Sequence, residues 1–274
     1  MTHLPPFLAS NQYSNQIAAV NANLMQMNDD AILATVIHRP FPLPESPPVL
    51  RQSWSKLLFA HWPVDAGVLR PLIPDCLEMD LFEGTAYLGV VPFAMRKVHP
   101  RFTPDMGWLS NFLELNIRTY VKKDGIPGVY FFSLDCNNPV AVTVARTTYH
   151  LPYFNARMTM DEQDSLIKYE SKRLNCDAVF QANYKSAGAV LKLSPASLDR
   201  FLTERYCLYT TDRRGRCFRG VIHHLMWQLQ PAEAEIITDT LSSTQLGFQL
   251  PDTKPLLHYS EYIDTLEWPL AKLD

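Results

Sequence analysis

The stretch that decides the fold is NFLELNIRTYV, residues 111–121. Its side chains alternate between two faces of an extended chain. One face is apolar and holds Leu113, Leu115, Ile117 and Val121. The opposite face holds Phe112, Glu114, Asn116, Arg118 and Tyr120. This alternation predicts a β-strand, because successive side chains of a strand point to opposite faces.

The flanking segments extend this strand into a sheet. KKDG at 122–125 carries the Asp-Gly signal of a hairpin turn, and GVYFFSL at 128–134 returns as the partner strand. Further strands are predicted in segments rich in aromatic and branched residues, at 54–62, 85–95, 157–192, 206–211, 218–224 and 256–268. Because the strands do not alternate with helices, we expect a mainly β (α+β) fold, an antiparallel sheet or barrel with a few short helices.

Two segments are candidates for helices. PVAVTVARTTYH at 139–150 has branched residues that favour a strand, but Asn138 followed by Pro139 is a good helix start, so both interpretations stay open. SPASLDRFLTE at 194–204 predicts a short amphipathic helix that begins at Ser194 and Pro195.

Composition divides the chain into three parts. Residues 11–28 contain eight Asn or Gln, and we interpret residues 1–30 as a poorly ordered leader. Five prolines between Pro40 and Pro48 predict an extended proline-rich arm over residues 31–50. Residues 51–274 are expected to form a single compact domain.

Charge and motifs exclude several classes of function. Lys and Arg number 25 against 28 Asp and Glu, so the chain lacks the basic excess of a nucleic-acid or membrane-surface binder. Gly-rich phosphate loops, G-x-S-x-G and H-E-x-x-H are absent. The first 38 residues hold no Lys or Arg, and no apolar run approaches the ~20 residues of a membrane span, so we expect a cytoplasmic protein.

Cysteines and histidines give no pattern of a metal site. The five cysteines form no C-x-x-C pair, and the histidines within the expected domain have no local ligand spacing. We therefore expect free thiols, and neither a metal nor a cofactor. His61, beside Trp62 at a strand end, is interpreted as a packed, hydrogen-bonded residue and not as a base; the alternative is that it shapes the mouth of a cavity.

Six strings together resemble a known family. They are RQSWSKLLFAHWPV, AYLGVVPFAM, FLELNIRTYV, GVYFFSLD, LTERYCLY and LLHYSEYIDTLEWPL. In this order and spacing, from about Ile32 to Leu270, they resemble the YqjF-like family of uncharacterised bacterial proteins. That family is similar, more distantly, to acetoacetate decarboxylase. The resemblance implies a cone-like antiparallel β-barrel with a small-molecule cavity at its mouth.

The decarboxylase acts through a lysine Schiff base. A neighbouring cation makes the amine of that lysine nucleophilic, and the enzyme is a standard example of this effect. Its lysine pair follows a segment of the type A-x-A-V-G-R-E-x-x-x-Y-P. The similar stretch here is VAVTVARTTYHLPYF, so Tyr153 and Phe154 stand where the lysines would be. Lys122-Lys123 is the only such pair, and we expect it in a turn. Schiff-base chemistry is therefore not expected.

The resemblance also places Glu114 at the position of an active-site glutamate. Asn116 and Arg118 share its strand face, and Glu114 and Arg118 lie about 13 Å apart along the strand. This face either lines a barrel cavity or is the solvated outside of the sheet. The resemblance favours the cavity.

Two functions of different class remain open. In the first, a small organic acid or carbonyl compound occupies the cavity. Glu114 then acts as acid/base, Arg118 or Arg205 holds the carboxylate, and Asn116, Tyr153 and His61 shape the site. Arg205 has a structural alternative, a buried ion pair at the helix end. In the second function, the protein is a non-catalytic ligand-binding or partner-binding module on the same fold. A homo-oligomer fits either reading.

Overall fold

The computed structural model describes residues 28–273 and confirms the mainly β fold. The strands are β1 (Leu50–Val64), β2 (Glu78–Met79), β3 (Ala86–Pro100), β4 (Phe112–Lys123), β5 (Ile126–Cys136), β6 (Tyr153–Gln163), β7 (Leu166–Arg173), β8 (Val179–Ser186), β9 (Cys207–Thr211), β10 (Cys217–His224), β11 (Gln230–Asp239), β12 (Leu256–Glu267) and β13 (Ala271–Lys272). The helices are short: α2 (Asp29–Ala34), α3 (Ala66–Leu69), α4 (Pro139–Thr148), α5 (Leu198–Thr203) and α6 (Thr240–Leu246), with 3-10 turns η1 (Arg70–Leu72) and η2 (Gly107–Leu109).

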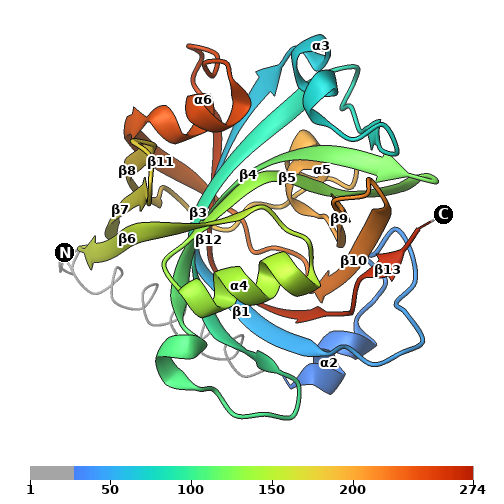
Figure 1. Ribbon diagram of the computed structural model, residues 1–274. Helices are drawn as coiled ribbons and strands as arrows, with labels where there is room; N and C mark the ends of the chain where they lie inside the picture. The colour runs from blue at the N-terminus through green and yellow to red at the C-terminus, as the bar shows by residue number, and fades with distance from the viewer. Residues whose placement is uncertain (1–27, 274) are drawn as a thin grey trace, which may run out of the picture.

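Five strands, in the order β5-β4-β3-β1-β12, form a wall that closes into a ring twice. Strands β6, β7, β8 and β11 close a nine-strand ring with this wall. Strands β9 and β10 close a seven-strand ring with the same wall. Figure 1 shows β6, β7, β8 and β11 at the left of the wall and β9 and β10 at its right. The predicted barrel is confirmed, and its sheet closes into two rings that share one wall.

The double closure depends on parallel pairings that the sequence did not suggest. Most pairs are antiparallel, as predicted, but β5 pairs in parallel with both β6 and β9. Residues 129–130 of β5 pair with β9, and residues 134–136 of the same edge pair with β6. One edge of β5 therefore pairs first with a strand of the seven-strand ring and then with a strand of the nine-strand ring.

Each ring has its own apolar interior. In the nine-strand ring, Leu115 and Ile117 of β4 belong to a core with Tyr169, Phe180 and Tyr184. In the seven-strand ring, apolar side chains from the other face of the wall, such as Phe59, Phe93, Leu134 and Ile222, form a second cluster. Strand β4 is buried on both faces as a result, so its alternation separates two interiors and not an inside from an outside.

The ambiguous segment at 139–150 is a helix, α4. The Asn138 side chain accepts hydrogen bonds from the backbone N–H groups of Val140 and Ala141, and Pro139 occupies the first turn. Capping decides the conformation over the strand preference of the branched residues. Helix α5 begins later than predicted, because Ser197 caps it and not Ser194.

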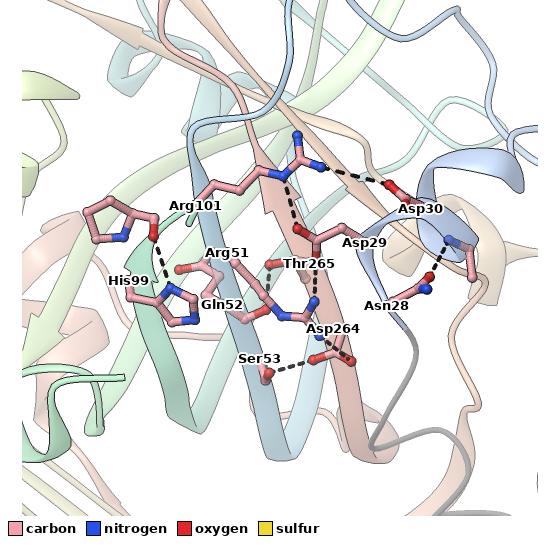
Figure 2. A network of polar contacts seen from close by, with 12 residues as sticks. Asn28, Asp29, Asp30, Arg51, Gln52, Ser53, His99, Arg101, Asp264 and Thr265 are labelled. Carbon is pink, nitrogen blue, oxygen red and sulfur yellow. Dashed lines mark hydrogen bonds and ion pairs between the residues drawn. The ribbon is translucent and has the colours of Figure 1, made fainter. Parts of the chain in front are cut away.

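The N-terminal segment is docked on the barrel from residue 28 onward. The predicted leader falls almost wholly on residues 1–27, which lie outside the described residues. Asp29 at the start of α2 forms ion pairs with Arg51 of β1 and with Arg101, and Figure 2 shows its carboxylate between the two guanidinium groups. Ile32 is buried against β10 and β12, so the arm contains one helical turn before its extended part.

Candidate functional site

A cavity of about 190 Å³ lies within the seven-strand ring. Its walls are mainly apolar and aromatic, and α4 covers one end with Ala141, Val144 and Ala145. Val144 also reaches the protein surface and marks the mouth. The lining side chains with a polar group are Gln52, Trp54, Glu114, Asn116, Arg118, Tyr149, Tyr153, Trp227 and Glu267. An apolar cavity with a few convergent polar groups is typical of a small-molecule site.

Glu114 is held inside this cavity by a short hydrogen bond. Its side chain is only 3% exposed, and the Tyr153 hydroxyl donates to Oε2 at 2.6 Å. The Asn116 amide donates weakly to Oε1 at 3.4 Å. Burial raises the pKa of Glu114 to about 7, although Tyr153, Asn116 and Arg118 each act to lower it.

A second carboxyl, Glu267 at the end of β12, lines the same cavity. Gln52 of β1 donates a hydrogen bond from Nε2 to its Oε1. Burial and the negative charge of Glu114 raise the pKa of Glu267 to about 8. Neither Gln52 nor Glu267 was predicted from the sequence. Glu267 has no local motif, and its position at the seven-strand ring follows from its pairing with Ile222 of β10 and Leu50 of β1.

Three buried polar atoms at this cavity have no hydrogen-bond partner within residues 28–273. They are the N–H groups Trp54 Nε1 and Arg118 Nε, and the carbonyl oxygen Asn116 Oδ1. Such atoms cost free energy on folding unless another group satisfies them. Two donors and one acceptor on residues that line the cavity are therefore left without a partner in the described part of the chain.

Arg118 extends from Glu114 toward the opposite end of the cavity. Its guanidinium carbon lies 5.3 Å from the ring centroid of Phe59, and Nη2 makes a long contact of 3.5 Å with the Leu202 carbonyl. The structure thus brings Glu114, Asn116, Arg118 and Tyr153 together around one cavity.

His61 is placed behind the cavity and not at its mouth. The side chain is fully buried, and Nε2 lies 2.6 Å from the hydroxyl of Tyr120, which itself donates to the Leu202 carbonyl. Nε2 therefore carries the proton in this network. Burial, with a smaller contribution from Arg118, lowers the pKa of His61 well below its usual value, so the ring is neutral.

Arg205 also lies outside the described cavity lining. Its guanidinium forms an ion pair with Asp80, donates to the Phe201 carbonyl and packs between the rings of Tyr120 and Phe201. These contacts fit the structural alternative, a buried ion pair at the end of α5. Sequence could not separate the two readings, because Asp80 is 125 residues away.

Tyr153 and Phe154, which stand at the positions of the lysine pair, lie in different surroundings. Tyr153 points into the cavity, whereas Phe154 stacks on the guanidinium of Arg173, 3.8 Å from its ring centroid. The described residues that line the cavity include no lysine. Lys122 and Lys123 end β4 at the turn to β5. Across residues 28–273, no cluster of three His, Cys, Asp or Glu side chains could hold a metal ion.

The fold is that of acetoacetate decarboxylase. A solved structure of that enzyme matches 90% of this chain and 98% of its own, with a TM-score of 0.57 and 14% identity. The acetoacetate decarboxylase of Legionella pneumophila gives a TM-score of 0.58 at 12% identity, covering 91% of this chain and 97% of its own. The enduracididine biosynthesis enzyme MppR, complexed with pyruvate, gives 0.57 at 9% identity, covering 86% and 93%.

Within this fold, the chain belongs to the DUF2071 family, described as an uncharacterized conserved protein, whose profile matches residues 51–264. A relative from Bacillus subtilis, the uncharacterized protein YqjF, is 46% identical over 225 residues, which is 82% of this chain and 92% of the relative. The family resemblance is confirmed. No helix in the described part of the chain is long and apolar enough to cross a membrane.

Proposed function

We propose that the protein binds a small organic acid or carbonyl compound in the cavity of the seven-strand ring and that Glu114 is the acid/base group of this site. The observation that carries the proposal is a carboxyl held by Tyr153 inside an apolar cavity. Its pKa of about 7 makes both the acid and the base available near neutral pH. General acid–base catalysis works best when the pKa lies near the operating pH.

The charge of the lining supports an oxygen-bearing ligand. Arg118 lines the cavity, and its guanidinium cation favours a carbonyl or carboxylate oxygen, an anionic one above all. The apolar walls would surround the rest of the molecule. A structural neighbour complexed with pyruvate, a small keto acid, supports the same ligand class by analogy of fold.

The proposed chemistry does not use a Schiff base. A Schiff base needs an amine at the carbonyl, and the described lining offers none. Proton transfer through Glu114 is the chemistry that the lining supports.

Thermal unfolding tests the binding. The probes are 4-methyl-2-oxopentanoate, its ketone analogue 4-methyl-2-pentanone and the acid 4-methylpentanoate. A ligand at about 100 times its Kd stabilises the folded state by ~2.7 kcal/mol, which raises the Tm. We expect at least one probe to raise the Tm of the wild-type protein, and Glu114→Gln to change that shift.

The control variant is Glu235→Gln, which alters an exposed carboxyl on β11. It should keep the wild-type response. If none of the probes changes the Tm, or if Glu114→Gln responds as the control does, the proposal is wrong for this ligand class.

A further inference from the structure

Two carboxyl groups, and not one, line the cavity. We infer that Glu267 is the second acid–base group of the site, and that Glu114 and Glu267 share one proton and transfer protons to and from a carbonyl compound with hydrogen on the adjacent carbon. This inference rests on the proposed function, because it assumes a carbonyl ligand in the cavity.

Neutral groups orient both carboxyls. Glu114 accepts from Tyr153 and, weakly, from Asn116, and Glu267 accepts from Gln52. Neither forms an ion pair with a described residue, in contrast to Asp135, which is paired with Arg173. Tyr153 comes from β6 and Gln52 from β1, so different strands fix the two carboxyls.

The titratable groups that face the pair are few. Arg118 on β4 is the only cation among them, and it lowers the pKa of Glu114 less than burial raises it. The others are neutral near pH 7: Tyr149 at the end of α4, Tyr153 on β6, Tyr169 on β7 and Cys136 on β5. Burial raises the pKa of each of these four groups.

Two carboxyls that line one apolar cavity cannot both be ionised at low cost, because each negative charge disfavours the other. The pair then takes up one proton near neutral pH, and its two titration steps belong to the pair. Such a pair offers an acid and a base to the same ligand at the same time. The pKa values, about 7 for Glu114 and about 8 for Glu267, agree with this description.

The reaction that the pair supports is keto–enol proton transfer. The ionised carboxyl takes a proton from the carbon next to the carbonyl, and the C–H electron pair becomes the new C=C bond. The protonated carboxyl gives its proton to the carbonyl oxygen, which receives the electron pair of the C=O π bond. One proton leaves the ligand and one enters it, so the pair keeps its single proton and the two groups exchange roles.

Coupling between the carboxyls can be tested without any ligand. Protein labelled with ¹³C at glutamate Cδ is titrated by NMR, and Glu114→Gln is compared with Glu235→Gln. The negative charge of Glu114 raises the pKa of Glu267, so its removal should lower the midpoint of Glu267 by about one pK unit or more. An unchanged midpoint of Glu267 in Glu114→Gln overturns the pairing. If that variant does not fold, the wild-type spectrum decides, since two carboxyl signals must titrate above pH 6, and ordinary midpoints near pH 4.5 overturn it.

Proton transfer is then tested by exchange in D₂O. The probe is 4-methyl-2-oxopentanoate, and NMR follows loss of its C3 hydrogens above the uncatalysed rate. We expect exchange with the wild-type protein and a loss of about 10²- to 10⁴-fold in Glu267→Gln, the range typical of one acid–base group. Full exchange in Glu267→Gln, or none in wild-type protein that binds the probe, overturns the inference.

The two proposals fail in different ways. If no probe changes the Tm, the proposed function fails, while the NMR titration still decides whether the carboxyls are coupled. If a probe binds but the carboxyls titrate independently, the proposed function stands and the inference about Glu267 fails.

Discussion

The two faces of the wall β5-β4-β3-β1-β12 are filled in different ways. Toward the nine-strand ring, Leu115 and Ile117 are completely buried against large side chains such as Tyr169 and Phe180. Toward the seven-strand ring, the alternating residues of the same strand border a cavity. One strand thus contributes to a close-packed core with one set of residues and to a hollow with the other.

Buried polar groups show the same difference. Asp135, on β5, accepts from Arg173 Nε at 2.9 Å and from Arg173 Nη2 at 2.7 Å, and its other oxygen accepts from Ser171 at 3.1 Å. At the cavity, Asn116 Oδ1 and Arg118 Nε have no partner among residues 28–273. Burial alone therefore does not distinguish a core from a site, because Asp135 and Asn116 are both buried and only Asp135 has partners for both oxygens.

The largest expected effect comes from truncation on the close-packed face. Ile117→Ala should lower the free energy of unfolding by about 2–5 kcal/mol, because the surrounding side chains cannot close the cavity that forms. Asn116→Ala, one residue away on the other face, should cost less than about 1 kcal/mol, since its amide makes only one weak contact. Urea unfolding of both variants measures the contrast. Equal losses would show that the two faces do not differ.

Next in size is the pH dependence of stability that the cavity face produces. Burial raises the pKa of Glu114 from 4.5 to about 7, so the folded state binds more protons than the unfolded state between these values. The stability is then fully present below pH 4.5 and falls as pH rises through the pKa of the folded state. At about 1.4 kcal/mol per pK unit, the wild-type protein should lose roughly 2 kcal/mol between pH 5 and pH 7 through Glu114.

Glu114→Gln removes this titrating group and should make the decline smaller by roughly 2 kcal/mol between pH 5 and pH 7, while the part that the raised pKa of Glu267 produces remains. Urea midpoints at pH 5, 6 and 7 measure the difference, with Glu235→Gln as the control. A slope in Glu114→Gln equal to that of the wild-type protein would mean that the Glu114 carboxyl titrates normally and is not buried as described.

The sequence predicted the strand at the centre of this comparison but not what covers it. The alternation in residues 111–121 defined both faces, and the resemblance chose the cavity for Glu114. The parallel pairings of β5 could not be predicted, because they join segments far apart in the chain. Without them, the apolar face and the polar face could not each be assigned to a closed ring.

The site residues also divide into those that the sequence could predict and those that it could not. Those on one strand, Glu114, Asn116 and Arg118, were found because periodicity places them on a common face. Glu267 was missed, and His61 and Arg205 were placed at a cavity they do not line, because their partners come from distant segments. Local sequence predicts to which face of a strand a side chain points, but it does not predict which residue lies next to that side chain across the barrel.

A smaller effect is expected at the partly exposed edge of the wall. Asp29 lies between Arg51 and Arg101, and the side chains of all three are 14–19% exposed. Asp29→Ala should lower the free energy of unfolding by about 1 kcal/mol, because ion pairs near water contribute little. Asp135→Ala should cost about 3–5 kcal/mol, because it leaves Arg173 buried without its partner. Urea unfolding ranks them, and equal costs would show that burial does not separate the two pairs.

The last prediction is that the cavity face forms no covalent adduct. A Schiff base requires a neutral amine close to the carbonyl, and a lysine supplies one only when burial or a neighbouring cation depresses its pKa. Lys122 and Lys123 are the half-buried last residues of β4 and are not among the residues that line the cavity, and Lys56 forms ion pairs with Glu162 and Glu261. Incubation with acetoacetate or pyruvate followed by borohydride should therefore leave no stoichiometric lysine adduct by mass spectrometry.

No adduct is expected because no lysine of the described residues lines the cavity, and Lys56, Lys122 and Lys123 are the positions at which an adduct would contradict this most directly. The described lining of the cavity places Tyr153 where the resemblance would place an amine, and the Tyr153 hydroxyl already donates to Glu114 at 2.6 Å. A one-to-one adduct at Lys56, Lys122 or Lys123 would mean that the reactive surface is the outside of the barrel. The difference between the two faces of the wall would then describe packing alone. With no adduct, proton transfer at the carboxyls remains the chemistry to test in the cavity.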